Sequence, residues 1–148
     1  MTEVTSFEGV LSDVQSELIG VSLEYAGTGV SDVYAHGSIE HNTVQFDPFF
    51  VIDGRVIERH NLPGVDTSGL RQRSLLQNGA GQLQRLRSAG ETFGRPVPTQ
   101  LKLHYVVASG SLDATYKYEA QYSNDPSVTT EDLVDQWQVE VQKQLGQS

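Results

Sequence analysis

The sequence predicts a single-domain α+β protein, in which an antiparallel sheet carries N-terminal, central and C-terminal helices packed mainly on one face. Two observations lead to this prediction. Apolar residues recur at three- and four-residue steps near both ends and in the middle of the chain, and at every second position between these segments. Short turns join the strand-like segments, which favours antiparallel pairing. Residues 1–148 have the length of one domain.

The first predicted element is a helix near the N-terminus. Thr5 and Glu8 have the spacing of a capping box, in which both side chains satisfy free amides at a helix start. Gly20 is the expected end of the helix. Its apolar stripe consists of residues three or four positions apart: Phe7, Val10, Leu11, Val14 and Leu18.

Alternating apolar residues then predict a meander of about four strands. The first two are expected at residues 21–25 and 33–39. The third spans residues 43–52 and pairs with residues 55–60. Asp53-Gly54 between them is the strongest hairpin signal in the chain, because both residues tolerate the positive φ of a type I′ turn.

A central helix and a second hairpin follow. Leucine spacing predicts one helix or two over about residues 66–89, since Gly79 and Gly81 weaken the middle of the segment, and Gly90 is expected to cap it. Residues 101–107 and 112–118 alternate in the manner of strands, and Ser109-Gly110 provides the turn. This C-terminal hairpin completes the predicted sheet.

The last predicted element is a C-terminal helix. Thr129 and Asp132 have capping-box spacing at its start. Its apolar face is expected to consist of residues four positions apart: Leu133, Trp137, Val141 and Leu145.

The net charge restricts the class of partner. Nineteen acidic residues against ten lysines and arginines give a net charge of −9. A nucleic-acid-binding surface requires a basic stripe, so nucleic acid is a poor partner, whereas a basic protein surface suits an acidic chain. The alternative is that the acidic residues serve solubility alone.

Charge is also unevenly distributed along the chain. Residues 1–54 contain nine acids and no lysine or arginine, residues 55–102 contain eight bases and three acids, and residues 103–148 contain seven acids and two lysines. One interpretation is that the arginine-rich middle packs beside acidic neighbours and is partly neutralised. The other is that the first third presents an uncompensated acidic surface.

The composition further favours a cytoplasmic protein. The chain contains no cysteine, which excludes disulfides and fits a reducing compartment. Its N-terminus lacks the basic start and unbroken apolar core of a signal peptide. No apolar run reaches the roughly 18 residues that a membrane span needs, so no membrane partner is expected.

Residue patterns that carry chemistry are weak. His36 and His41 do not form a metal site, since zinc needs three or four ligands and their odd spacing places the rings on opposite faces of a strand; both are expected to be exposed. No serine lies in a Gly-x-Ser-x-Gly elbow. Glu131-Asp132 fits a capping role at a helix start. We therefore expect no enzyme, no catalytic residue, no cofactor and no metal.

Aromatic residues fall into two groups. The first is expected to fill the core between sheet and helix: Tyr116, Tyr118 and Trp137. The second falls on predicted outward or loop positions, where exposed aromatics favour protein contacts. These candidates for interface anchors are Tyr34, Phe50 and Tyr122.

Three segments carry a family resemblance. Residues 49–63 resemble the strand–turn–strand and His-Asn-x-Pro-like corner of the YezG/EsaG-like antitoxins, and residues 82–87 followed by 98–103 are similar to their helix and next strand. Residues 110–119 with Trp137 resemble the family's Gly-x-Phe/Leu-x-x-x-Tyr-x-Tyr-Glu hairpin and late tryptophan. These antitoxins are immunity proteins of bacterial polymorphic and type VII-secreted toxin systems. The resemblance implies a cytoplasmic protein that silences a cognate secreted toxin, often a nuclease.

Charge and resemblance together predict the partner and its contacts. A nuclease surface must be basic to hold phosphate, so the partner is expected to be a basic toxin domain. The alternatives are a chaperone or adaptor for a secreted basic substrate and a small enzyme or ligand-binding domain. Monomer and dimer both remain open. The predicted partner-binding residues, from the acidic first third and its aromatic anchor, are Glu24, Asp32, Tyr34, Glu40, Asp47 and Asp53.

Overall fold

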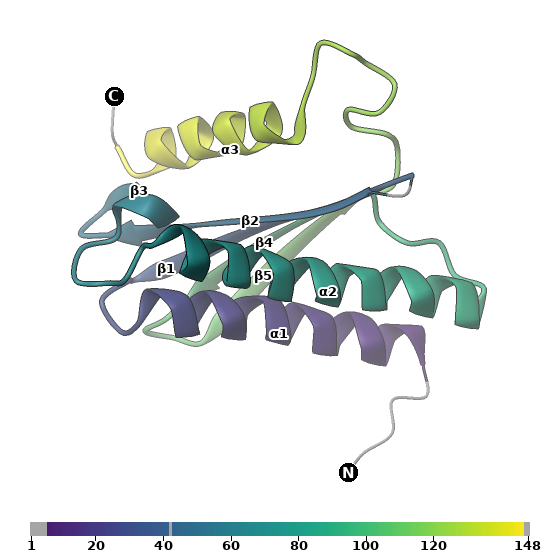
Figure 1. Ribbon diagram of the computed structural model, residues 1–148, viewed down its shortest axis with the longest axis horizontal. Helices are drawn as coiled ribbons and strands as arrows, with labels where there is room; N and C mark the ends of the chain where they lie inside the picture. Colours follow the sequence, from purple (N-terminus) through teal and green to yellow (C-terminus); the bar gives the residue numbers. More distant parts are fainter. Residues whose placement is uncertain (1–5, 42, 147–148) are drawn as a thin grey trace.

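The computed structural model describes residues 6–41 and 43–146, which form a five-stranded antiparallel sheet with helices on both faces (Figure 1). The predicted α+β class with an antiparallel sheet is confirmed. In chain order the elements are α1 (Phe7–Ala26), β1 (Asp32–Glu40), β2 (Thr43–Ile52), β3 (Arg55–Glu58), the 3-10 helix η1 (Arg59–Asn61), α2 (Gly69–Phe93), β4 (Gln100–Val106), β5 (Ser111–Lys117) and α3 (Thr130–Gln144).

The strand order of the sheet is β3-β2-β1-β4-β5. β1, β2 and β3 form a meander, and the β4–β5 hairpin pairs with the free edge of β1. Asp53 and Gly54 have φ values of 52° and 74°, as the predicted type I′ turn requires. β1 is the central strand, with Tyr34 opposite Phe49 of β2 and His104 of β4.

α1 is longer than predicted, and the strand expected at residues 21–25 is wrong. Its buried stripe continues past Leu18 to Ser22, Tyr25 and Ala26 at helical spacing. Ser22 fits this stripe because its hydroxyl donates to the Leu18 carbonyl at 2.8 Å. The helix ends at Gly27, with φ 76°. Ser6 caps its start by accepting from the Gly9 amide at 3.1 Å, while Thr5 of the expected capping box lies outside the described residues.

α1 and α2 lie side by side and cover one face of the sheet (Figure 1). Leu83 and Leu86 of α2 are fully buried there, in one apolar cluster with Val33, Ala35 and Leu101 of the sheet. Every second residue of β1 therefore faces these two helices.

α2 is one continuous helix, and the predicted cap at Gly90 is wrong. Gly90 lies inside the helix, where an added Cβ would sit 2.1 Å from Cγ2 of Val97. The cap is Gly94, in the left-handed conformation with φ 62°. Gly79 does not break the helix either, because it makes room for the buried ring of Phe46 on β2.

α3 lies on the opposite face of the sheet from α1 and α2 (Figure 1). The expectation of helices mainly on one face thus holds for α1 and α2 and is wrong for α3. The predicted capping box of Thr129 and Asp132 is confirmed. Leu145 of the predicted apolar face is exposed, and the buried residues of α3 are Thr130, Val134, Trp137 and Val141.

Across residues 6–41 and 43–146, no helix combines the length and hydropathy that a membrane crossing requires.

Candidate protein-binding groove

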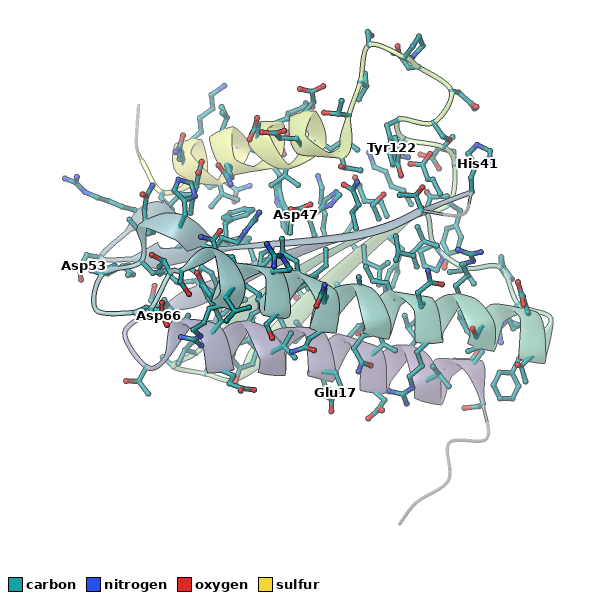
Figure 2. The ribbon with its side chains drawn as sticks, viewed as in Figure 1. Glu17, His41, Asp47, Asp53, Asp66 and Tyr122 are labelled. Carbon is teal, nitrogen blue, oxygen red and sulfur yellow. The ribbon has the colours of Figure 1, made fainter. Side chains whose placement is uncertain are left out.

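A groove of about 530 Å³ lies between α3 and the β2–β3 hairpin. Asp47 of β2 points into the space between sheet and helix (Figure 2). The groove is rich in ionisable side chains, contributed by β2, by the end of β3, by η1 and by α3. They are Asp47, Glu58, Arg59, His60, Glu131 and Asp135.

Local structure fixes the α3 side of this groove, which carries Glu131 and Asp135. The capping box between Thr129 and Asp132 sets the first turn of α3, and Thr130 Oγ1 donates to Gln45 Oε1 of β2. Glu131 and Asp135 are four residues apart, so they lie on one face of the helix, toward the groove.

The floor of the groove follows from strand alternation in β2. Asp47 lies two residues before Phe49, whose side chain packs under Trp137 of α3 with ring centroids 5.1 Å apart. Residues two apart on a strand share a face, so Asp47 also faces α3. The sheet beneath α3 is therefore apolar under Trp137 and acidic under the first turn.

Carboxylates outnumber permanent cations in the groove. Arg59 Nη1 lies 3.5 Å from Asp47 Oδ1, and both side chains are mostly buried. Burial raises the pKa of Asp47, Arg59 lowers it, and the nearby Asp135 carboxylate raises it further, with a net upward shift. A second cation in the groove would stabilise the Asp47 carboxylate.

The exposed rim of the groove carries another pair. His60 Nε2 lies 3.3 Å from Glu58 Oε2, with both side chains about half exposed. Within the part of the chain that the structure describes, no three His, Asp or Glu residues are grouped closely enough to hold a metal ion. The arrangement suits a basic side chain, which hydrogen-bonds to several carboxylates at once.

The structure brings only one of the predicted contact residues into this groove, namely Asp47. Glu24 is exposed near the end of α1. Asp53 is exposed at the tip of the β2–β3 hairpin (Figure 2). Asp32 is mostly buried and pairs with His104 of β4, its Oδ2 lying 2.7 Å from Nε2. The predicted acidic residues therefore do not form one surface.

Glu40 is a structural residue, and its prediction as an exposed contact is wrong. It is 4% exposed and accepts hydrogen bonds from the amides of Gln121 and Ser123 and from the Ser123 hydroxyl. Burial alone raises the pKa of Glu40, but these hydrogen bonds together outweigh it and lower the pKa. The carboxylate thus fastens the segment between β5 and α3 to the end of β1.

Tyr34 is also buried, so its predicted role as an exposed anchor is wrong. It stacks between Phe49 and His104, at centroid distances of 5.0 Å and 4.1 Å, and meets Trp137 edge-on. Phe50 is fully buried in the α1–α2 core. Alternation of apolar and polar residues along β1 predicts an outward side chain for Tyr34, but α3 covers this second face of the sheet too.

His36, expected to be exposed, is fully buried under α3. Its Nε2 donates to Gln100 Oε1 at 3.0 Å. Burial lowers the pKa of His36 to about 4; the Gln100 bond opposes this shift and the charge of Lys102 adds to it. Lys102 lies over the Trp137 ring at 5.3 Å, so a cation and a neutral imidazole flank the tryptophan.

The Asp32–His104 pair was missed by sequence reasoning, because it joins residues of β1 and β4. Ser31 Oγ donates to Asp32 Oδ1 at 2.6 Å. The hydroxyl therefore contacts the carboxylate and not the imidazole, whereas a nucleophilic triad needs the imidazole beside the hydroxyl. The three side chains form a hydrogen-bonded clasp at the start of β1.

Ion pairs neutralise part of the acidic first third. Asp13 of α1 pairs with Arg85 of α2 at 2.6 Å, and Glu8 pairs with Arg95. The interpretation that arginines of the middle segment pack beside acidic neighbours is confirmed at these pairs. The acidic residues of α3 have no such compensation within their own helix. Lys143 is the only base among residues 130–144, against Glu131, Asp132, Asp135 and Glu140.

No protein-family model matches the chain, and no curated protein matches it.

Proposed function

We propose that this protein is a cytoplasmic immunity protein that binds a basic toxin domain and silences it. The observation that carries the proposal is the groove beneath the first turn of α3, where Asp47, Glu131 and Asp135 face a single permanent cation, Arg59. The family resemblance supports the toxin as partner. The whole-chain charge of −9 supports its basic character.

Binding would proceed in two physical steps. The net charge of −9 steers a basic domain toward the protein and raises the association rate. An arginine or lysine of the partner then enters the groove and hydrogen-bonds to Glu131 and Asp135, beside the partly buried Asp47. The partner is silenced because its basic surface, which would hold its own anionic substrate, is occupied.

Co-expression tests the biological role. A candidate basic toxin domain is expressed alone and together with the protein, and growth is followed. Immunity predicts that the protein restores growth against the isolated toxin domain. A chaperone or adaptor would instead require the targeting region of the secreted substrate, and rescue that depends on that region would overturn the proposal.

Matched charge variants locate the site. Glu131→Gln with Asp135→Asn removes two carboxylates from the groove, and Glu17→Gln with Glu24→Gln removes two exposed ones from α1, on the other side of the sheet (Figure 2). Both doubles change the net charge equally. The groove double is expected to abolish rescue at low expression, while the α1 double retains it. Equal loss in both would assign the effect to net charge alone.

A further inference from the structure

The two edges of the sheet differ in how they are protected. β3 is four residues long, leads directly into η1, and lies beneath α3. β5 is seven residues long and contains no proline or glycine, and β4 is its only strand neighbour in the described structure. Open edges of this length present backbone groups that can pair with another strand.

The exposed side chains of β5 have a symmetric order. Asp113 and Lys117 lie two residues on either side of Thr115. Leu112 and Tyr118, the residue that directly follows β5, lie three residues on either side and are 36% and 53% exposed. A strand with this order is complementary to a second antiparallel copy of itself.

We propose that the free edge of β5 pairs antiparallel with β5 of a second copy of this chain, on a two-fold axis that passes through Thr115. In that register Thr115 of one copy faces Thr115 of the other. Asp113 of each copy faces Lys117 of the other, so two opposite-charge pairs form. Leu112 faces Tyr118 of the second copy, which covers two of the exposed apolar side chains of the molecule. Directly opposed pairs of opposite charge and of apolar groups stabilise antiparallel strands.

Local charge does not oppose pairing at this edge. β4 and β5 carry Lys102 and Lys117 against Asp113, so the hairpin is slightly basic in a chain with a net charge of −9. Two copies of this acidic chain can therefore pair along β5 without bringing net negative charge together. A two-fold contact uses the same patch on both copies and closes on itself, so it yields a dimer and not a fibre.

The dimer would join two sheets into one of ten strands, because each copy contributes five. The α3 groove lies beside β2 and β3, at the far edge of each sheet. Both grooves would stay open in the dimer, so this inference stands independently of the proposed function.

A single cysteine tests the register directly. The chain contains no cysteine, so Thr115→Cys introduces the only thiol. Opposed Cβ atoms in an antiparallel pair lie about 4.5–5.5 Å apart, near disulfide range, so mild oxidation should convert Thr115→Cys to a covalent dimer. Asp113→Cys is the matched control. In this register its two thiols are offset by four residues, or about 14 Å, and should not join.

Charge reversal tests the same pairs without a cross-link. Asp113→Lys alone and Lys117→Asp alone place like charges opposite each other twice, and each should weaken dimerisation roughly tenfold by analytical ultracentrifugation. The double variant restores opposite charges and should dimerise like the unmodified chain. Circular dichroism confirms that each variant is folded, which the exposure of both side chains favours.

Three results would overturn the proposal. One is a monomer at every concentration together with no covalent dimer of Thr115→Cys. Another is equal cross-linking of Asp113→Cys and Thr115→Cys, which would place the contact in another register or leave it random. The third is a double charge variant that dimerises no better than the single ones.

Discussion

On the α1–α2 face of the sheet β1 contributes Val33 and Ala35 to an apolar core, whereas on the α3 face the same strand contributes Tyr34, His36 and Glu40. Both sets are buried. The first is held by close packing alone, and the second by specific partners such as Gln100, Trp137 and Ser123. The difference teaches that burial on the α3 face depends on hydrogen bonds and on an uncharged His36. The groove lies on this same face, between the sheet and α3.

The largest expected effect lies on the apolar face. Leu83 is fully buried, and Leu83→Ala should lower the free energy of unfolding by about 2–5 kcal/mol, since it leaves a cavity between α2 and the sheet. Leu133 of α3, which is only half-buried, provides the matched control. Urea unfolding of both variants measures the difference. Equal losses of unfolding free energy in the two variants would contradict the claim that close apolar packing on the α1–α2 face contributes most to stability.

Acid sensitivity should come from the α3 face. His36 has its pKa lowered from 6.5 to about 4, so the unfolded chain binds this proton more readily than the folded one. Its contribution is present above pH 6.5 and falls by up to about 3 kcal/mol as the pH drops toward 4. Unfolding free energies of the wild type and His36→Gln, across this range, should show a shallower pH dependence in the variant.

Two glycines of α2 should respond in opposite directions. Gly79→Ala brings a Cβ within 2.0 Å of the Phe46 ring and should cost about 1–3 kcal/mol, because the buried ring must move. Gly81 faces open space, and Gly81→Ala should stabilise the helix by up to about 1 kcal/mol. Thermal unfolding of both variants checks the sign. If both substitutions stabilised the protein, the Phe46 ring would have to move away from the added Cβ at little cost, which would contradict this account.

The smallest expected effect concerns the hydrogen bonds that Glu40 accepts from the segment between β5 and α3. Glu40→Gln removes the charge that accepts from Gln121 and Ser123, and should cost about 1 kcal/mol. The carboxylate has a lowered pKa, so its contribution is present above the usual pKa of a glutamate and is lost as the pH falls through the folded value. Hydrogen exchange at the amides of residues 121 and 123 should accelerate in the variant. The exposed Glu119→Gln should leave those amides unchanged.

Sequence periodicity was sufficient for most elements of the fold. The Asp53-Gly54 turn, the Thr129 cap and the strands β1, β2, β4 and β5 follow from local patterns that tertiary packing does not override. The segment at residues 21–25 was misassigned because Val21 and Leu23 alternate, while the stripe through Ser22 contains a serine whose burial depends on its bond to Leu18. Local alternation cannot reveal that bond.

The candidate site was harder to predict, because pairing across strands and the side occupied by α3 decide it. A strand residue faces solvent or a helix depending on where a distant helix packs, which Tyr34 and Glu40 show. Asp47, a predicted contact residue, lines the groove, whereas the spacing at the start of α3 indicates only a capping role for Glu131, which lines it too. The acidic composition of residues 130–144 was the signal that could have identified it.

The most direct measurement is the dissociation constant between the purified protein and the basic toxin domain proposed as its partner. It is determined for the wild type, for Glu131→Gln with Asp135→Asn, and for Glu17→Gln with Glu24→Gln. The variant Glu131→Gln with Asp135→Asn loses contacts in the groove, so we expect it to weaken the complex by roughly a hundredfold. The second double should weaken it by less than about fivefold, with that loss disappearing at high salt. Equal weakening by both doubles, or binding that neither alters, would contradict a groove-centred mode of inhibition.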